Sequence, residues 1–249
     1  MIVLRSQREI EKIRRACKIV AEILVKLKEH IQPGVTTLDL NVLSEELALK
    51  HDAKPAFKGY HGYPFSLCTS VNEEVVHGMP SARRSLAQGD IISIDFGVVV
   101  DGYFGDAAVT VPVGSVDPEA ERLCKVTEGS LYEGIRQAAA GNRLSDISHA
   151  IQEYVEARGF SVVRDFVGHG IGQRLHESPQ IPNYGPPGKG VRLKTGMVLA
   201  IEPMINQGRP EVEVLGDEWT AITADRQLSA HFEHTVAVTE NGPDILSRV

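Results

Sequence analysis

The sequence predicts an α/β (α+β) protein of two pseudo-twofold related halves, in which helices cover a curved, mainly antiparallel sheet. An internal repeat carries this prediction: GDIISID, which starts at Gly89, matches GMVLAIE, which starts at Gly196. Each copy follows two segments with helical spacing and precedes a second acid, which opens a run of small and β-branched residues. A repeat of about half the chain is too long for a solenoid and favours two related halves.

Two helices are expected at the start of the first half. Ser6 with Glu9 three residues later is a capping-box pattern, and apolar residues then recur at helical spacing until Pro33-Gly34 ends the segment. A second helix is expected over about 36–51. Its inward-facing residues are predicted to be Leu40, Leu43 and Leu47, with Val42 as a further candidate.

A loop is expected over 53–65 and a strand over 66–71, after which comes a hairpin that carries two acids. Asp95 ends one short apolar run, Asp106 opens the next, and the pair Asp101-Gly102 between them predicts a tight turn. The two acids are then expected to face each other. Because a buried acid is costly unless it is paired or holds a metal, the hairpin indicates a cation site rather than a solvated turn.

The second half is predicted to repeat this order. Asp117 as N-cap and Pro118 at the first helical position open a helix expected to run to Gly141, and another helix follows over about 145–158. A strand over 160–167 then leads to a His-Gly corner at His169, as the earlier strand leads to His77-Gly78.

Composition is that of an ordinary globular protein. Of 249 residues, 42% are hydrophobic and 24% charged, so we expect a single domain over 1–249 with internal halves of about 1–114 and 115–249. The net charge of −7 argues against a general nucleic-acid binder, and no apolar run approaches the ~18 residues of a membrane helix. Three cysteines without CxxC spacing indicate a reducing, cytoplasmic location: Cys17, Cys68 and Cys124.

The repeat brings four carboxylates together, because Asp95 aligns with Glu202 and Asp106 with Glu233. One imidazole, His169 by preference, would complete an oxygen-rich site with a single nitrogen. Four carboxylates balance two divalent ions, which can hold a bridging water that becomes a nucleophile near neutral pH. These ligand types fit Mn, Fe(II), Co or Zn.

Six sequence blocks then identify a family. They are GYHGYP at Gly59, VNEEVVHGMP at Val71, DGYFGD at Asp101, GHGIG at Gly168, LHESPQIPNYG at Leu175 and AIEPM at Ala200. On these blocks, and over nearly its whole length, the chain resembles type I methionine aminopeptidase. The resemblance implies the two-halved pita-bread fold and a methionyl aminopeptidase, a dinuclear metallopeptidase (hydrolase). Such an enzyme removes the N-terminal methionine from nascent proteins and peptides whose second residue is small, by a dimetal-bound hydroxide.

The resemblance also implies roles for single residues. Its metal ligands would be Asp95, Asp106, His169, Glu202 and Glu233, holding two ions of Co, Mn, Fe(II) or Zn, with Asp106 and Glu233 bridging. In the implied mechanism His77 touches the substrate backbone, His176 stabilises the oxyanion and Glu202 moves a proton. The remaining histidines are interpreted as structural or surface residues: His30, His51, His61, His149, His231 and His234.

A pocket for the methionine side chain is implied as well. Its substrate-binding residues would be Tyr60, Tyr63, Cys68, Leu175 and Trp219, together with His77 and His176. Aromatic walls suit a polarizable thioether. Loop packing is the alternative for the tyrosines, and a small core residue is the alternative for Cys68. Phe57 stands where some members have Cys, and Leu175 where some have Phe, so the shape of the pocket is expected to differ.

Two alternatives stay open. Aminopeptidase P and prolidase share the five ligands but usually carry a large N-terminal domain, whereas this chain starts almost directly with its first helix. The second alternative is a catalytically inactive relative that acts as a binding module. Retention of every predicted metal ligand argues against this alternative. The partners expected are nascent polypeptide N-termini and a transient ribosome contact, with no membrane and no specific nucleic acid, for a cytoplasmic monomer. Since Ile2 is large and β-branched, the rule for the second residue predicts that Met1 is kept.

Overall fold

The antiparallel sheet that the sequence predicts is the centre of the molecule. The computed structural model describes residues 2–248, so the expectation for Met1 lies outside the described residues. The sheet has nine strands, and every strand pair described within it is antiparallel. The main path across the sheet is β1 (Lys54–Pro55), β4 (Ile91–Val100), β5 (Tyr103–Pro112), β14 (Glu233–Thr239), β9 (Val198–Ile201), β7 (Gly168–Gly170) and β8 (Glu177–Ile181). Two further strands join it: β2 (Leu67–Val71) pairs with β4, and β15 (Gly242–Ile245) pairs with β14.

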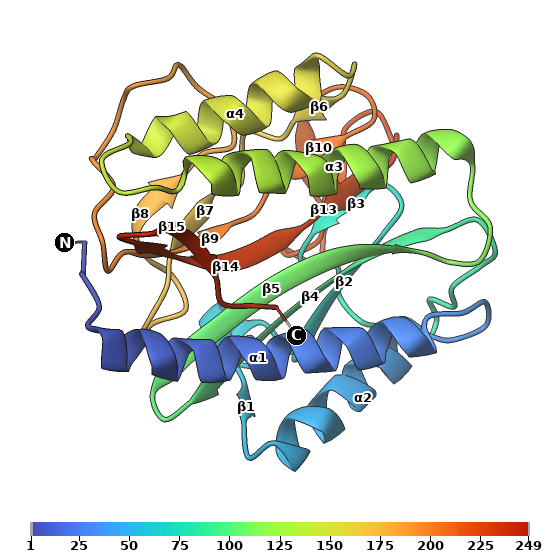
Figure 1. Cartoon of the computed structure of the whole chain (residues 1–249). Coiled ribbons are helices and arrows are strands. Elements are labelled where there is room, and N and C mark those ends of the chain that lie inside the picture. The colour runs from blue at the N-terminus through green and yellow to red at the C-terminus, as the bar shows by residue number, and fades with distance from the viewer. Residues whose placement is uncertain (1, 249) are drawn as a thin grey trace.

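Four helices cover the sheet in two pairs. They are α1 (Gln7–His30), α2 (Thr37–Lys50), α3 (Pro118–Gln137) and α4 (Leu144–Glu156). Figure 1 shows α1 and α3 running alongside each other, with β5 and β14 crossing the space between them, while α2 lies beyond α1 and α4 beyond α3. This arrangement confirms the predicted fold class of two related halves.

The first helix begins where the capping box predicts and packs directly on the acid-bearing hairpin. The Ser6 backbone N–H donates to the Glu9 carboxylate at 2.9 Å, and the Glu9 N–H donates back to the Ser6 hydroxyl at 3.4 Å. Farther along, a Cβ atom on Gly105 would lie 2.5 Å from the backbone nitrogen of Cys17. Glycine therefore lets α1 approach β5 next to Asp106.

The turn between β4 and β5 is the predicted tight turn. Val100 pairs with Tyr103, and both central residues have positive φ, 51° at Asp101 and 77° at Gly102. Two successive positive φ values are typical of the two-residue hairpin turn that matches the right-handed twist of its strands. The turn fixes the register of the whole hairpin.

The second helix packs through the expected face, with Leu40 buried and Leu43 and Leu47 against the same cluster, but Val42 does not join them. Val42 is 48% exposed rather than inward-facing, whereas Leu40 and the polar Asn41 are buried. The Asn41 side-chain oxygen accepts the backbone N–H groups of Ser66 at 2.9 Å and Leu67 at 3.2 Å. These hydrogen bonds to the start of β2 turn Asn41 inward, so Val42 points away.

Three expected boundaries also differ. The region expected as a loop contains β1 and a 3-10 turn at Tyr60–Gly62, and the strand expected over 160–167 is only β6 (Ser161–Val162). The helix expected to reach Gly141 ends at Gln137, where α3 stops. β6 is short because only its two residues pair with the neighbouring strand, and the chain then turns to enter β7.

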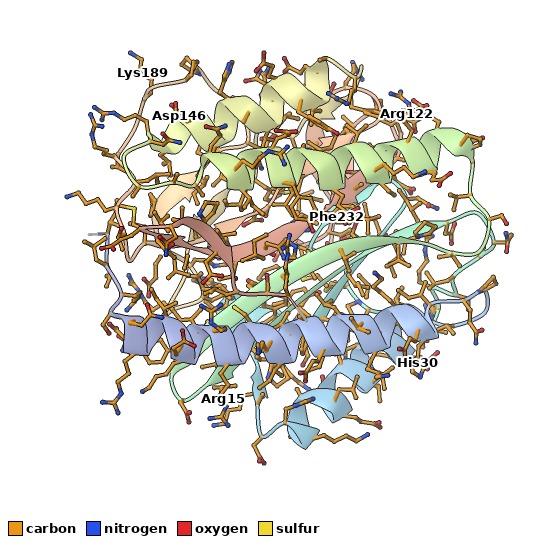
Figure 2. The ribbon with its side chains drawn as sticks, viewed as in Figure 1. Arg15, His30, Arg122, Asp146, Lys189 and Phe232 are labelled. Atoms are coloured by element: carbon orange, nitrogen blue, oxygen red, sulfur yellow. The ribbon has the colours of Figure 1, made fainter. Side chains whose placement is uncertain are left out.

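Two smaller sheets flank the main one. One contains β13 (Ser229–His231), β10 (Met204–Asn206) and β6, and the other contains β11 (Val212–Val214), β12 (Ala221–Thr223) and β3 (Glu74–Val76). Phe232, which joins β13 to β14, is buried in the hydrophobic cluster beneath α3 and lies near the middle of the view in Figure 2. In the part of the chain that the structure describes, no helix has the length and apolarity needed to span a bilayer.

Candidate active site

Strand register places three acids on one face of the sheet. Ala108 in β5 pairs with Asp95 of β4 on one side and with Glu233 of β14 on the other. Asp106 precedes Ala108 by two residues, so its side chain lies on the same face. Asp95 and Asp106 are therefore diagonal neighbours rather than directly opposed, because Asp106 itself pairs with Gly97. β5 and β14 are joined by only two residue pairs, and one of these includes Glu233.

The same rule adds the remaining acid and the histidine. His234 pairs with Ile201, so the register carried one residue further brings Glu233 opposite Glu202, which follows the end of β9. His169 pairs with Ala200, two residues before Glu202, and so shares its face. Strands from both halves thus deliver all five predicted ligands to one place.

The nitrogen of His169 is prepared to coordinate a cation. Its Nδ1 lies 2.9 Å from the carbonyl oxygen of Gly170 and donates to it, which leaves Nε2 without a proton in the neutral ring. Nε2 lies 3.4 Å from a carboxylate oxygen of Glu202. One ligand atom each from His169, Asp106 and Glu233 lie within 4.8 Å of one another.

The electrostatics of the acid cluster favour a divalent cation. Among the described residues, one oxygen each of Asp95, Asp106 and Glu233 is buried without a hydrogen-bond partner. Burial raises the pKa of Asp95 to about 7, and burial together with the neighbouring carboxylates raises the pKa of Asp106, Glu202 and Glu233 well above the usual range. Divalent cations would satisfy these oxygens and neutralise their repulsion, so the donor set fits a metal centre.

The acid cluster lies at a cavity of about 230 Å³, and every predicted site residue lines this cavity. Its lining consists of Phe57, Tyr60, His61, Tyr63, Cys68, His77, Asp95, Asp106, His169, Leu175, His176, Glu202, Trp219 and Glu233. The acids and His169 come from the sheet, whereas the aromatic residues come mainly from connecting segments. The cavity therefore joins a charged floor to a largely apolar wall.

The aromatic wall is held by hydrogen bonds. The Tyr63 hydroxyl lies 3.1 Å from the carbonyl oxygen of Leu67 and 3.2 Å from that of Gly78, and its ring meets the Trp219 ring edge to face at 5.1 Å. The Asp217 carboxylate accepts the backbone N–H of Trp219 at 2.9 Å, which fixes this turn. Tyr63 is thus a rigid wall residue.

Cys68 lies opposite Asp95 across the β2–β4 pair. Burial raises the pKa of its thiol well above the ordinary value, and the nearby Asp95 adds to the effect. The side chain therefore stays an uncharged thiol and contributes a small apolar surface to the cavity.

The two histidines predicted to be catalytic, His77 and His176, sit differently from His169, which is predicted to be a metal ligand. His169 lies within β7, whereas His77 follows β3 in a left-handed conformation with φ of 60°, so the two His-Gly pairs are not equivalent. Burial lowers the pKa of His77 to about 4. His176 directs Nδ1 at the Tyr60 hydroxyl, 2.8 Å away, and its ring stands edge to face with the His169 ring at 4.3 Å. Burial and the nearby His61 lower the pKa of His176.

Two histidines interpreted as structural or surface residues belong to this region. His61 lines the cavity, and His231 is buried with Nε2 3.8 Å from a carboxylate oxygen of Glu202. Burial lowers the pKa of His231 to about 3, so the ring is neutral.

Comparison with known proteins decides the family. A model of metallopeptidase family M24 matches residues 11–240. Over 249 residues, the chain is 55% identical to methionine aminopeptidase 1 of Bacillus subtilis, with 100% of each chain covered. The chain belongs to the methionine aminopeptidases of family M24. As a methionine aminopeptidase, it is a hydrolase that uses divalent metal.

Solved structures agree with this membership. The crystal structure of methionine aminopeptidase from Thermotoga maritima matches with a TM-score of 0.99 at 51% identity and covers 100% of both chains. The prolidase of Pyrococcus horikoshii matches with a TM-score of 0.81 at 22% identity, covering 100% of this chain and 64% of that one, so it shares the fold alone. The pita-bread fold expected for a methionine aminopeptidase is thereby confirmed.

Proposed function

We propose that this chain removes the N-terminal methionine from nascent proteins and peptides whose second residue is small, using two divalent metal ions. The observation that carries the proposal is the set of four carboxylates and one imidazole that strand register gathers on one face. Three of their buried oxygens have no hydrogen-bond partner among residues 2–248, which suits a site completed by cations. Co, Mn, Fe(II) and Zn all accept such a donor set.

We assign the ligands by their places in the sheet. Asp106 and Glu233 lie in the adjoining central strands β5 and β14 and would bridge the two ions. The other three ligands, Asp95, His169 and Glu202, come from the flanking strands or their ends, and each would bind one of the two ions. When bound, the ions supply hydroxide near neutral pH by lowering the pKa of water.

The protein's own groups would carry the proton and hold the developing charge. Glu202 would take up and pass on a proton, since its carboxylate lies between the imidazoles of His169 and His231 and keeps 14% of its side chain exposed. His176 would donate a hydrogen bond to the oxyanion, and His77 would hold the substrate backbone. Both of these histidines line the same cavity as the acids.

The apolar wall would set the preference for methionine. Tyr63 and Trp219 offer aromatic surfaces, and Cys68 and Leu175 add small or aliphatic ones. A thioether makes favourable contacts with aromatic rings, so this wall suits an unbranched sulfur-containing side chain. A small second residue would be needed because the cavity floor is crowded by the ligands and His77.

We further propose that the enzyme works as a cytoplasmic monomer on nascent chains, with a transient ribosome contact. Three buried cysteines without disulfides support a reducing compartment: Cys17, Cys68 and Cys124.

The test is a direct activity assay. Enzyme reconstituted with Mn or Co is offered Met-Ala-Ser beside an Ala-Pro peptide, and release of free amino acids is followed. Release of methionine alone is expected. Release of alanine from the Ala-Pro peptide at a comparable rate would instead assign a proline-directed activity, and no release from either would point to a binding role.

A further inference from the structure

Tyr60 makes a specific contact that its place in the apolar wall does not explain. Its hydroxyl oxygen lies 2.8 Å from Nδ1 of His176, and the two rings are tilted by 55° with centroids 5.1 Å apart. His176 lies partly exposed at the mouth of the cavity, and this is the only hydrogen bond to its ring within the described chain. The hydrogen bond from Tyr60 therefore orients this imidazole together with its edge contact to the His169 ring.

The Tyr60 hydroxyl is placed to donate to Nδ1 of His176. Burial raises the pKa of Tyr60, so the hydroxyl keeps its proton. Among residues 2–248, Nδ1 of His176 is the one acceptor within hydrogen-bond distance of this hydroxyl. With Nδ1 accepting, the single proton of a neutral imidazole must sit on Nε2.

We propose that Tyr60 is a positioning residue that holds His176 in its Nε2-protonated tautomer. This inference rests on the proposed role of His176 as the oxyanion donor. A neutral ring with hydrogen on Nε2 can donate on the side away from Tyr60, whereas the other tautomer offers only a lone pair there. Tyr60 would therefore fix both the orientation and the tautomer of the His176 ring. The aspartate of a Ser-His-Asp triad does the same for the catalytic histidine of other hydrolases.

The backbone places Tyr60 for this role before substrate arrives. Gly59 and His61 on either side have positive φ, 86° and 49°, which wraps the chain into a tight 3-10 turn. The Tyr60 N–H donates to the Phe57 carbonyl at 2.9 Å, and the Tyr60 carbonyl accepts the Tyr63 N–H at 2.9 Å. The hydroxyl is thus presented by a closed local structure.

The test compares Tyr60→Phe with the wild type by nitrogen NMR of protein labelled with 15N-histidine. Both proteins are loaded with diamagnetic Zn, and the His176 signals are assigned by their loss in His176→Ala. We expect one Nε2-protonated tautomer in the wild type and a mixture with the Nδ1-protonated form in Tyr60→Phe. We expect kcat on Met-Ala-Ser to fall about 3–10-fold, the usual range for one hydrogen bond, with KM changed less than about twofold.

Tyr63→Phe is the matched control for the NMR signal, because it removes a hydroxyl from the same cavity that does not touch His176. It should leave the His176 tautomer unchanged. Circular dichroism and metal content verify that each variant is folded and loaded. A single unchanged tautomer in Tyr60→Phe, or a mixture without loss of kcat, would overturn the inference. A wild-type enzyme that fails to cut Met-Ala-Ser would overturn the proposed function instead, and the tautomer result would still be readable.

Discussion

The guanidinium of Arg5 forms a buried ion pair with the carboxylate of Glu177, with Nη2 lying 2.6 Å from Oε1 and 2.5 Å from Oε2. Their side chains are only 4% and 7% exposed. Glu177 also accepts the backbone N–H groups of Gln173 and Arg174, at 2.9 and 3.1 Å. A Cβ on Gly172 would lie 2.2 Å from the guanidinium, so glycine there leaves room for Arg5 to reach Glu177. The segment that carries His176 is thereby tied to the residues before α1.

Arg5→Ala should strongly destabilise the protein, because it leaves Glu177 buried without its partner. Breaking a buried pair on one side typically costs about 3–5 kcal/mol. Arg15→Ala is the matched control, since the Arg15–Asp101 pair is 63% and 60% exposed and such pairs contribute about 0–1 kcal/mol. Urea denaturation of both variants measures the difference. Equal stability of the two variants would show that the Arg5 contact does not hold this segment.

Removing metal should abolish peptidase activity, and Mn or Co should restore it, because no side chain in the cavity can generate hydroxide near pH 7. Asp106→Ala should lose metal as well as turnover if Asp106 bridges the ions. Elemental analysis and activity are measured on the same samples. Full turnover in a verified metal-free sample would exclude a metal-dependent mechanism, and normal metal content in the variant would move the bridging role elsewhere.

The metal-free protein should lose stability as the pH rises from about 6.5 to 8.5. In the folded state burial raises the pKa of Asp95 from 3.8 to about 7, and burial with the neighbouring carboxylates raises the pKa of Asp106 in the same direction. The folded state then binds more protons than the unfolded state in this range, so raising the pH favours unfolding. Neutral buried histidines such as His169 act oppositely, but this contribution fades as the pH rises through about 6.5, where the unfolded chain loses their protons.

Thermal unfolding with and without metal measures this dependence. Asp95→Asn should flatten the slope above pH 6.5, because it removes one of the shifted groups. Bound metal should reverse the trend, since its ligands must be deprotonated and its affinity therefore rises with pH. A metal-free protein that gained stability over this range would contradict the raised pKa values.

His176→Ala should separate chemistry from coordination. Deleting one oxyanion donor usually lowers kcat by about 10²–10³-fold, and the metal content should be unchanged because His176 is not assigned as a ligand. His77→Ala should lower the rate similarly, with a larger effect on substrate positioning. Steady-state kinetics and elemental analysis measure both properties. Loss of one equivalent of metal from either variant would make that histidine a ligand.

Selectivity for the second residue should be steric. Met-Ala and Met-Gly peptides should be cut, whereas Met-Ile should be rejected by more than the ~10–200-fold that one methylene gives in an apolar pocket. The ratio of kcat/KM values for matched tripeptides measures the discrimination. Equal rates on Met-Ala and Met-Ile would exclude a small second site.

The sheet and its ligand face could be predicted because they depend on short-range regularities. The alternation around Asp95 and the repeated Gly-to-acid pattern at Glu202 can be recognised from neighbouring residues alone. The strand register then brings these acids to the same face of the sheet. The contact of His231 with Glu202 depends instead on β13 pairing with Met204 of β10, a pairing that no local pattern specifies. The exposure of Val42 could not be predicted for the same reason, because Asn41 is buried by its hydrogen bonds to the start of β2.

The contacts that orient His176 could not be predicted for the same reason. Tyr60 is 116 residues away in sequence, and Arg5 is 172 residues away from Glu177. Neither partner lies in a periodic segment that would indicate its direction. The family resemblance places Tyr60 in the pocket wall and gives no indication of its hydroxyl contact with His176.

The pairing of β5 with β14 determines when the acid cluster can form during synthesis of the chain. Only two residue pairs connect these strands, Glu233 with Ala108 and His234 with Ala107. Residues so distant in sequence pair late, because the intervening chain must be synthesised and folded first. Glu233 can join the acids of the first half only after β14 has emerged from the ribosome. A chain that ends before β14 therefore contains only part of the acid cluster that lines the cavity.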